Sequence, residues 1–481
     1  MRNIKIIKEY RDINATLIDR WLKYLLILSI ILIPFDNLPY FKSLLGELSV
    51  RGSVYAFIPI IVLTFLNLLL NKEIFIPKGR TKTNILLFFA WVVISTVINL
   101  SSILNNFFKG RTGNEKLVLQ LFVFIFMLLI GYCSIYIIER NNITLKDIRR
   151  YILFSFIPVG IVGILELLNM FFVIDFSSII EKISYLVHFY NRGIVYPKGV
   201  RSVTGEASYF AMYSAFAFPF IISYVFTENK LKNKISWGAL ATLFFILILF
   251  TKSRTAYAII FIEIFMLFLF IISAKIDNSK KKILIVIAVE LAAIIFLFNQ
   301  DFATKYGGDV NSAQELSVTG LQNSLSDSDN MSNVARLGMM RAAFNVGKDN
   351  PIFGVGIGQF GFYASQYVDE RALTSNEVQN WVNPKLETNF WPPCFSLYNR
   401  IVAEQGIIGI LLWLNIGIYC LFRLIKRVYT TRNDFLGIAL LMSFIGVAIC
   451  SLNADTFAYI SLWILMPLID KYTSEKNQYE Y

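Results

Sequence analysis

Arginines and glutamates recur at the ends of long apolar segments in this 481-residue chain. Arg201 and Glu206 lie in the stretch GVRSVTGEASYFA, directly before the apolar residues 212–226. A guanidinium group can hold phosphate oxygens through two hydrogen bonds, and a carboxylate beside it can accept the proton of an attacking hydroxyl group. The pair therefore predicts chemistry on a phosphorylated substrate at the mouth of a membrane helix. Glu206 has an alternative role, because an acid at a helix start is favoured by the helix dipole and by a neighbouring arginine.

Further arginines occupy comparable positions. Arg254 lies in the tight turn FTKSRTAYA between two apolar segments, and Arg51 precedes another segment. A short turn holds Arg254 near the headgroup plane, where it either clamps a substrate phosphate or pairs with a lipid phosphate.

The stretch SNVARLGMMRAAFNVGKDNP predicts a helix that begins near Ser332 and ends with Gly347 in the left-handed position after the last turn. At 100° per residue, Arg336 shares a face with apolar side chains, and Arg341 lies on the opposite face. Arg336 is therefore predicted to point into protein, where it needs an anionic partner, and Arg341 is predicted to be solvated.

Carboxylates at other apolar segments are also candidates. Glu404 begins one such segment and is the second candidate for a general base. Glu166, Glu263 and Glu290 lie inside segments, where a carboxylate either acts in function or bonds neighbouring helices.

Several kinds of site are disfavoured. The glycine-rich stretch GVGIGQFG follows no strand, so it predicts an irregular turn and not a nucleotide loop. His188 is the only histidine, which nearly excludes a histidine-based metal site or a Ser–His–Asp triad. No dense carboxylate cluster predicts a metal ion, and we expect no cofactor.

The elements that must position these residues are membrane helices. Hydrophobic residues make up 56% of the chain, and its mean hydropathy is +0.58. Apolar runs of about 17–25 residues, each long enough to cross a ~30 Å hydrocarbon layer, predict an all-α polytopic membrane protein with about twelve spans. We expect these spans at residues 21–36, 52–71, 83–101, 117–138, 150–174, 208–227, 235–251, 255–273, 282–298, 406–424, 434–452 and 456–470.

Basic residues predict the orientation of the spans. Lysines and arginines cluster in the N-terminal tail and in alternate connections, which places both termini in the cytoplasm. The net charge of +12 then reflects topology and contact with membrane lipids, and no nucleic-acid motif accompanies it. We expect an N-terminal membrane region (1–298), a large extracytoplasmic loop with short helices (299–405) and a C-terminal membrane region (406–481).

Local patterns and their order carry a family resemblance. The segments GVRSVTGEASYFAMY, SRTA, RLGMMRAAFNVG with the following NPIFGVGIGQF, and SLYNRIVAEQGIIGILL resemble those of the bacterial O-antigen polymerase (Wzy) and O-antigen ligase superfamily. The layout of spans around one long outer loop is similar over the whole chain. The resemblance implies a GT-C-type fold in the bacterial cytoplasmic membrane. It also implies undecaprenyl-diphosphate-linked oligosaccharides as donor and acceptor, with a chain-length regulator and a flippase as further partners.

The resemblance also implies roles for individual residues. Glu206 is the first choice for the catalytic base and Glu404 the second. The remaining candidates bind diphosphate (Arg201, Arg254, Arg336 and Arg51) or support the substrate and the loop (Arg341, Gly347 and Tyr398).

One departure favours the polymerase branch. Ligases of this superfamily carry a histidine ahead of the final glycine, and the stretch CFSLYNRIVAEQG has none. The favoured function is therefore a polymerase that joins lipid-linked repeat units, with a ligase-type glycosyltransferase as the alternative. A transporter with twelve spans is a third possibility, but the two halves show no repeat and the connection after the sixth expected span is short.

Overall fold

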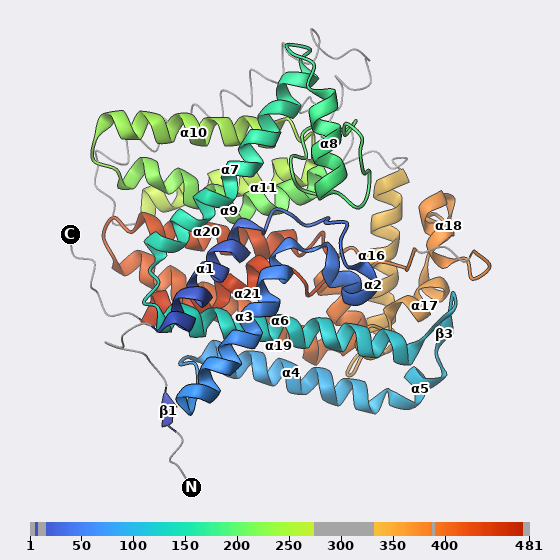
Figure 1. Cartoon of the computed structure of the whole chain (residues 1–481). Coiled ribbons are helices and arrows are strands. Elements are labelled where there is room, and N and C mark those ends of the chain that lie inside the picture. The colour runs from blue at the N-terminus through green and yellow to red at the C-terminus, as the bar shows by residue number, and fades with distance from the viewer. Residues whose placement is uncertain (1–4, 8–15, 274–330, 387–389, 475–481) are drawn as a thin grey trace.

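The computed structural model describes residues 5–7, 16–273, 331–386 and 390–474, and these residues are mostly helical (Figure 1). Seven of the described helices are long and apolar enough to cross a membrane: α3, α4, α6, α7, α9, α10 and α19. The predicted class, an all-α polytopic membrane protein, is confirmed. The expected spans overlap helices throughout the described residues, whereas span 282–298 lies outside them.

The long helices follow the apolar segments closely. They are α1 (Leu17–Ile31), α3 (Gly52–Asn71), α4 (Arg80–Ile98), α6 (Gly113–Arg140), α7 (Leu145–Met170), α9 (Ala207–Thr227), α10 (Leu231–Leu249), α11 (Arg254–Ser273), α19 (Leu397–Thr430), α20 (Phe435–Cys450) and α21 (Ile460–Ser474). Several ends differ from expectation, among them two where the helix is shorter: α1 stops at Ile31, shortly before Pro34, and α21 begins only at Ile460. Residues 32–36 and 456–459 therefore lie outside these two helices, where they can contribute to a site at the helix ends.

Further elements lie in the connections between these helices. They are the helices α2 (Lys42–Leu45), α5 (Leu100–Asn105), α8 (Ser177–Val187), α16 (Met331–Asp349), α17 (Phe360–Tyr367) and α18 (Asn376–Val382), and the 3₁₀ helices η1 (Gly46–Val50) and η3 (Ala372–Thr374). Strand β1 (Lys5–Ile7) pairs in parallel with β2 (Glu73–Phe75), and β3 (Phe107–Phe108) pairs antiparallel with β4 (Arg111–Thr112).

Capping boxes close the starts of long helices such as α6 and α7. The Thr112 hydroxyl accepts from the Glu115 amide, and the Glu115 carboxylate accepts from the Thr112 amide, which closes a capping box at the start of α6. Thr144 and Asp147 repeat this arrangement at α7. Each box satisfies amide groups that a helix start leaves without an internal partner.

Helix α9 lies at the centre of the bundle. It packs against α20, α10, α11 and α7, and 94% of its apolar stretch is buried. Helix α4 is a peripheral helix, with only 22% of its apolar stretch buried. Since α9 begins at Ala207, the polar residues just before it are held by the most buried of the seven candidate spans.

The helices of residues 331–382 gather at one end of the bundle. Figure 1 shows α16, α17 and α18 at the right, on the side opposite the strand β1. Helix α16 packs along α19, where a Cβ on Gly347 would come within 2.5 Å of Val402 Cγ1. The prediction that Gly347 ends the helix in a left-handed conformation is wrong, because α16 continues to Asp349 and Gly347 serves as a close-packing position.

Helix α19 is broken where the loop meets the membrane region. Gly406 has a φ of 67° and interrupts the helical backbone between the segments before and after it. A Cβ there would come within 2.3 Å of the Ile352 carbonyl oxygen, so both conformation and space require glycine. The stretch GVGIGQFG packs beside this break as an irregular turn, as predicted, and the amide of Val355 donates to the Ala403 carbonyl oxygen.

Candidate functional site

A cavity of about 570 Å³ opens where the start of α9 meets α16, α18 and the connection between α20 and α21. Its volume lies in the usual range for small-molecule sites. The charged groups that line it are Arg51, Lys198, Glu206, Arg336, Glu377 and Asp455. Three residues predicted from the sequence, Arg51, Glu206 and Arg336, therefore share one cavity although they lie far apart in the chain.

The side chain of Arg201 fixes the loop before α9. This side chain is only 1% exposed, and one terminal nitrogen donates to the Ser184 hydroxyl at 2.9 Å and to the Asn191 carbonyl oxygen at 3.1 Å. Arg201 does not line the cavity described above. Its guanidinium group is committed to protein oxygens and fixes the loop that carries Glu206.

Glu166 supports the same loop from within α7. Its carboxylate accepts hydrogen bonds from the amides of Arg201 at 2.9 Å and Ser202 at 2.7 Å. Ser202 has a φ of 55°, a conformation that this pair of bonds stabilises. The Glu166 carboxylate therefore anchors this loop, which accounts for its position inside an apolar segment.

Glu206 occupies the cap position of α9 but its side chain does not cap the helix. Its carboxylate is exposed and lines the cavity, and its hydrogen-bond neighbour among the described residues is the Ser208 hydroxyl at 3.5 Å. Within the described part of the chain, no ion pair joins Glu206 to Arg201. Neither capping nor pairing with Arg201 occupies this carboxylate.

Two arginines line the same cavity as Glu206 and come from different elements. Arg51 precedes α3, and its guanidinium lies 5.5 Å from the centre of the Tyr209 ring. Arg336 on α16 donates to Asn453 Oδ1 at 3.1 Å and lies 5.4 Å from the centre of the Phe395 ring. The partners recorded for Arg336 are an amide and an aromatic ring, so the anionic partner expected from the sequence is not provided by these contacts.

Asp36 adds a carboxylate beside this group. Its Oδ1 accepts from the Gly205 amide at 2.7 Å, which ties the loop before α9 to the connection after α1. Burial raises the pKa of Asp36 to about 6, although nearby Arg51 and the Gly205 amide act to lower it.

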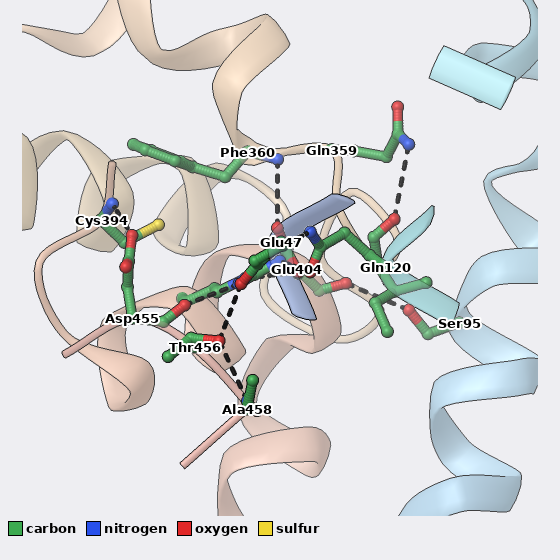
Figure 2. Close-up of polar contacts among 12 residues, drawn as sticks. Glu47, Ser95, Gln120, Gln359, Phe360, Cys394, Glu404, Asp455, Thr456 and Ala458 are labelled. Carbon is green, nitrogen blue, oxygen red and sulfur yellow. Dashed lines mark hydrogen bonds and ion pairs between the residues drawn. The ribbon is translucent and has the colours of Figure 1, made fainter. Parts of the chain in front are cut away.

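A buried polar network underlies the cavity and is drawn in Figure 2. Arg400 on α19 donates to Glu404 at 3.2 Å, to Gln120 at 2.7 Å and to the Asp455 carbonyl oxygen at 2.6 Å. Glu404 is 2% exposed and does not line the cavity. Because it is paired with Arg400, Glu404 belongs to the supporting network. This pairing counts against Glu404 as the catalytic base.

Glu47 completes this network from η1. Its carboxylate accepts from Gln120 at 2.9 Å and from the Thr456 hydroxyl at 2.9 Å (Figure 2). Burial by itself would raise the pKa of Glu47, but Arg400 and these two hydrogen bonds together lower it. The carboxylate is therefore charged, and it holds Thr456 at the rim of the cavity.

Arg341 and Tyr398 are not among the residues that line the cavity. Arg254 is the first residue of α11, and the neighbouring Thr255 hydroxyl accepts from the same Asn453 that binds Arg336. Tyr398 donates to the Ala448 carbonyl oxygen and so joins α19 to α20. Arg341 is exposed, as predicted, and lies 3.6 Å from Asp369.

The sequence analysis missed Asp455 and Asn453. Both belong to the non-helical connection at residues 451–459, between α20 and α21. Asp455 lines the cavity, and its carboxylate accepts from the Cys394 amide at 2.6 Å. A short polar break between two apolar segments is the signal that could have revealed them.

The described residues contain no group of three or more histidine, cysteine, aspartate or glutamate side chains that could hold a metal ion. Burial, with Arg201 nearby, lowers the pKa of His188 to about 3, so its imidazole is neutral at pH 7. His188 is a buried neutral group beneath the loop and not a titrating one.

Comparison with known proteins bears on the second half of the chain. Residues 239–414 match the family model described as O-antigen ligase (Wzy_C), a range that includes Arg254, Arg336 and Glu404. No curated protein sequence matches the chain. The match does not distinguish polymerases from ligases. Over residues 239–414, it confirms that the chain resembles the O-antigen polymerase and ligase superfamily of membrane glycosyltransferases.

Proposed function

We propose that the protein is a polysaccharide polymerase that joins undecaprenyl-diphosphate-linked repeat units at the outer face of the cytoplasmic membrane. The observation that carries this proposal is one cavity lined by an uncommitted carboxylate, Glu206, and two arginines, Arg51 and Arg336. A carboxylate and a cationic phosphate site are the two groups that glycosyl transfer from a lipid diphosphate requires.

The arginines would receive the leaving group. As the bond between the anomeric carbon and the phosphate oxygen breaks, the electron pair stays on the diphosphate. Arg51 and Arg336 can stabilise that developing charge through bidentate hydrogen bonds. Arg254 remains a proposed third contact, because the turn that carries it is tied through Thr255 and Asn453 to Arg336.

Glu206 would act on the acceptor. The acceptor hydroxyl oxygen forms the new bond to the anomeric carbon, and its proton passes to the Glu206 carboxylate. Asp455 is a second carboxylate on the same cavity. We assign Arg201 a positioning role, since its guanidinium holds the loop of Glu206, and Glu404 a positioning role through Arg400.

The cavity also offers a surface for sugar rings. Trp381, Phe390 and Phe395 line it beside the charged residues. Aromatic side chains present rigid apolar faces next to polar groups, a combination suited to rings with both apolar faces and hydroxyl edges. An oligosaccharide attached to the diphosphate can therefore extend from the arginines toward α18.

One observation favours a ligase function: the matched family model is described as O-antigen ligase. Purified protein supplied only with lipid-linked repeat units separates the two functions. A polymerase elongates these units into a ladder of products, whereas a ligase yields product only when a lipid A–core acceptor is added. A ladder without that acceptor supports the proposal, and its absence together with transfer to lipid A–core contradicts it.

Arg336→Lys tests the phosphate site in the same assay. Lysine keeps the positive charge but loses the planar fork, so we expect the elongation rate to fall by roughly 10²–10³. Lys348→Arg, at an exposed position of the same helix outside the cavity, is the control and should leave the rate unchanged. Equal rates for wild type and Arg336→Lys would remove Arg336 from the site.

A further inference from the structure

A second large cavity lies between α3, α4, α6 and α21, away from the candidate site. Its volume is about 520 Å³, and it is a groove with an almost wholly apolar wall. Its lysines, Lys78 and Lys82, lie at the start of α4, whereas Ser95 and Asn99 near the end of α4 contact the glycine-rich turn beside the candidate site. The groove therefore opens toward the opposite end of the bundle.

The shape of the groove suits a hydrocarbon chain. Its lining residues on α6 run from Ile125 to Ile135, which is roughly 15 Å at 1.5 Å per residue. Phe89, Leu128 and Trp463 contribute apolar side chains along this length. Gly131 also lines the groove, and an added Cβ there would be in van der Waals contact with Trp463 Cε3 at 3.6 Å.

The mouth of the groove carries net positive charge. Asp470 is the acid in the lining, and it is already paired with Arg423 and accepts from the Thr81 hydroxyl at 2.8 Å. Lys82 is half-buried at the first turn of α4, and Arg80 lies exposed beside it. An apolar groove with a basic mouth matches a lipid that has an anionic headgroup.

We propose that this groove binds an anionic phospholipid of the leaflet opposite the candidate site. One acyl chain lies between α4 and α6, and the headgroup phosphate is held at Lys82 beside the start of α4. The proposal is independent of the glycosyltransferase chemistry, because it rests on a separate cavity at the other end of the bundle.

Native mass spectrometry of the full-length protein in detergent tests this site with two lipids, phosphatidylglycerol and phosphatidylcholine. We expect phosphatidylglycerol to be retained preferentially. Lys82→Gln should weaken its retention roughly five-fold, the factor associated with one basic residue at a lipid headgroup. Lys232→Gln is the matched control, because Lys232 is exposed at the start of α10, outside the groove, and should leave retention unchanged.

A second variant tests the chain site independently of charge. Gly131→Leu places a side chain in the groove and should reduce retention by roughly 50-fold, equivalent to about three displaced methylene groups. The measurement uses only protein that elutes as a single species, so misfolded protein is excluded. If Gly131→Leu does not fold, Lys82→Gln at the helix start still tests the proposal. Equal retention of both lipids, unchanged retention in Lys82→Gln, or displacement of phosphatidylglycerol by undecaprenyl phosphate at equal concentration would overturn the proposal.

Discussion

At the scale of single residues, the site separates groups that face the cavity from groups that hold them. Glu206 and Arg336 line the cavity with few protein partners, whereas Arg201 and Glu404 are buried and hydrogen-bonded to protein groups. Substitutions of side chains of the same type are therefore expected to differ in their effects on activity and on stability.

Substitution of Glu206 tests the base. Glu206→Gln keeps the size of the side chain but cannot accept a proton, so turnover should fall by roughly 10²–10⁴. The melting temperature should stay near that of the wild type, because the side chain makes no cap. Elongation of lipid-linked repeat units and thermal unfolding of the purified protein measure the two effects, with Glu228→Gln at the other end of α9 as the control. A fully active Glu206→Gln protein would transfer the base role to Asp455.

Asp36 gives the protein a pH-dependent contribution to stability. The pKa of Asp36 is raised from 3.8 to about 6, so between these values the folded state binds more protons than the unfolded state. The contribution of this group is complete below pH 3.8 and is lost as the pH rises through about 6. Asp36→Asn removes the titration but still accepts from the Gly205 amide. Relative to wild type, its melting temperature should therefore increase as the pH rises across this window, and a constant difference would contradict the assignment.

At the scale of elements, two anchored segments shape the site. Glu166 and Arg201 fix the loop before α9, and Gly406 breaks α19 so that the turn at residues 354–358 can pack against it. These anchors explain why the charged residues are presented by rigid backbone.

Gly406→Ala tests the break in α19. Alanine at a φ of 67° and a ψ of −166° is strained by roughly 1–3 kcal/mol, and its Cβ would also meet the Ile352 carbonyl oxygen at 2.3 Å. We expect a clear loss of thermal stability. Gly417→Ala on the same helix is the control, since no atom lies within 4 Å of its added Cβ, and it should be neutral or stabilising by up to about 1 kcal/mol. Similar melting temperatures for the two variants would show that the break is not required.

At the scale of the whole molecule, helices end alternately on two sides, and the candidate site lies on one of them. The basic connections predict that this side is extracytoplasmic. Cysteine labelling tests the orientation, because the four native cysteines are buried.

Lys385→Cys, in the exposed connection after α18, should react with a membrane-impermeant reagent in cells with a permeabilised outer envelope. Lys232→Cys, exposed at the start of α10, should react only after the cytoplasmic membrane is opened. The reverse pattern would invert the topology and place the cavity in the cytoplasm, where the proposed outer-face reaction could not occur.

The sequence by itself determined the class of the protein and the course of its helices. Bilayer thickness sets the length of an apolar segment, and intrahelical hydrogen bonds satisfy its backbone, so hydropathy alone located helices such as α9 and α19. The sequence also indicated the mouth of α9 as a site, because Arg201 and Glu206 are close in the chain. The twelve-span count and the GT-C-type fold remain predictions.

Only the tertiary structure decided which charged residues share a cavity. Arg201 turns inward because its acceptors, Ser184 and Asn191, belong to a neighbouring connection that local sequence cannot relate to it. Asp455 reaches the cavity from a break near the end of the chain, and Glu404 is withdrawn from it by Arg400. Burial and pairing are set by contacts between distant segments, and these contacts separate the groups that face the cavity from the groups that support them.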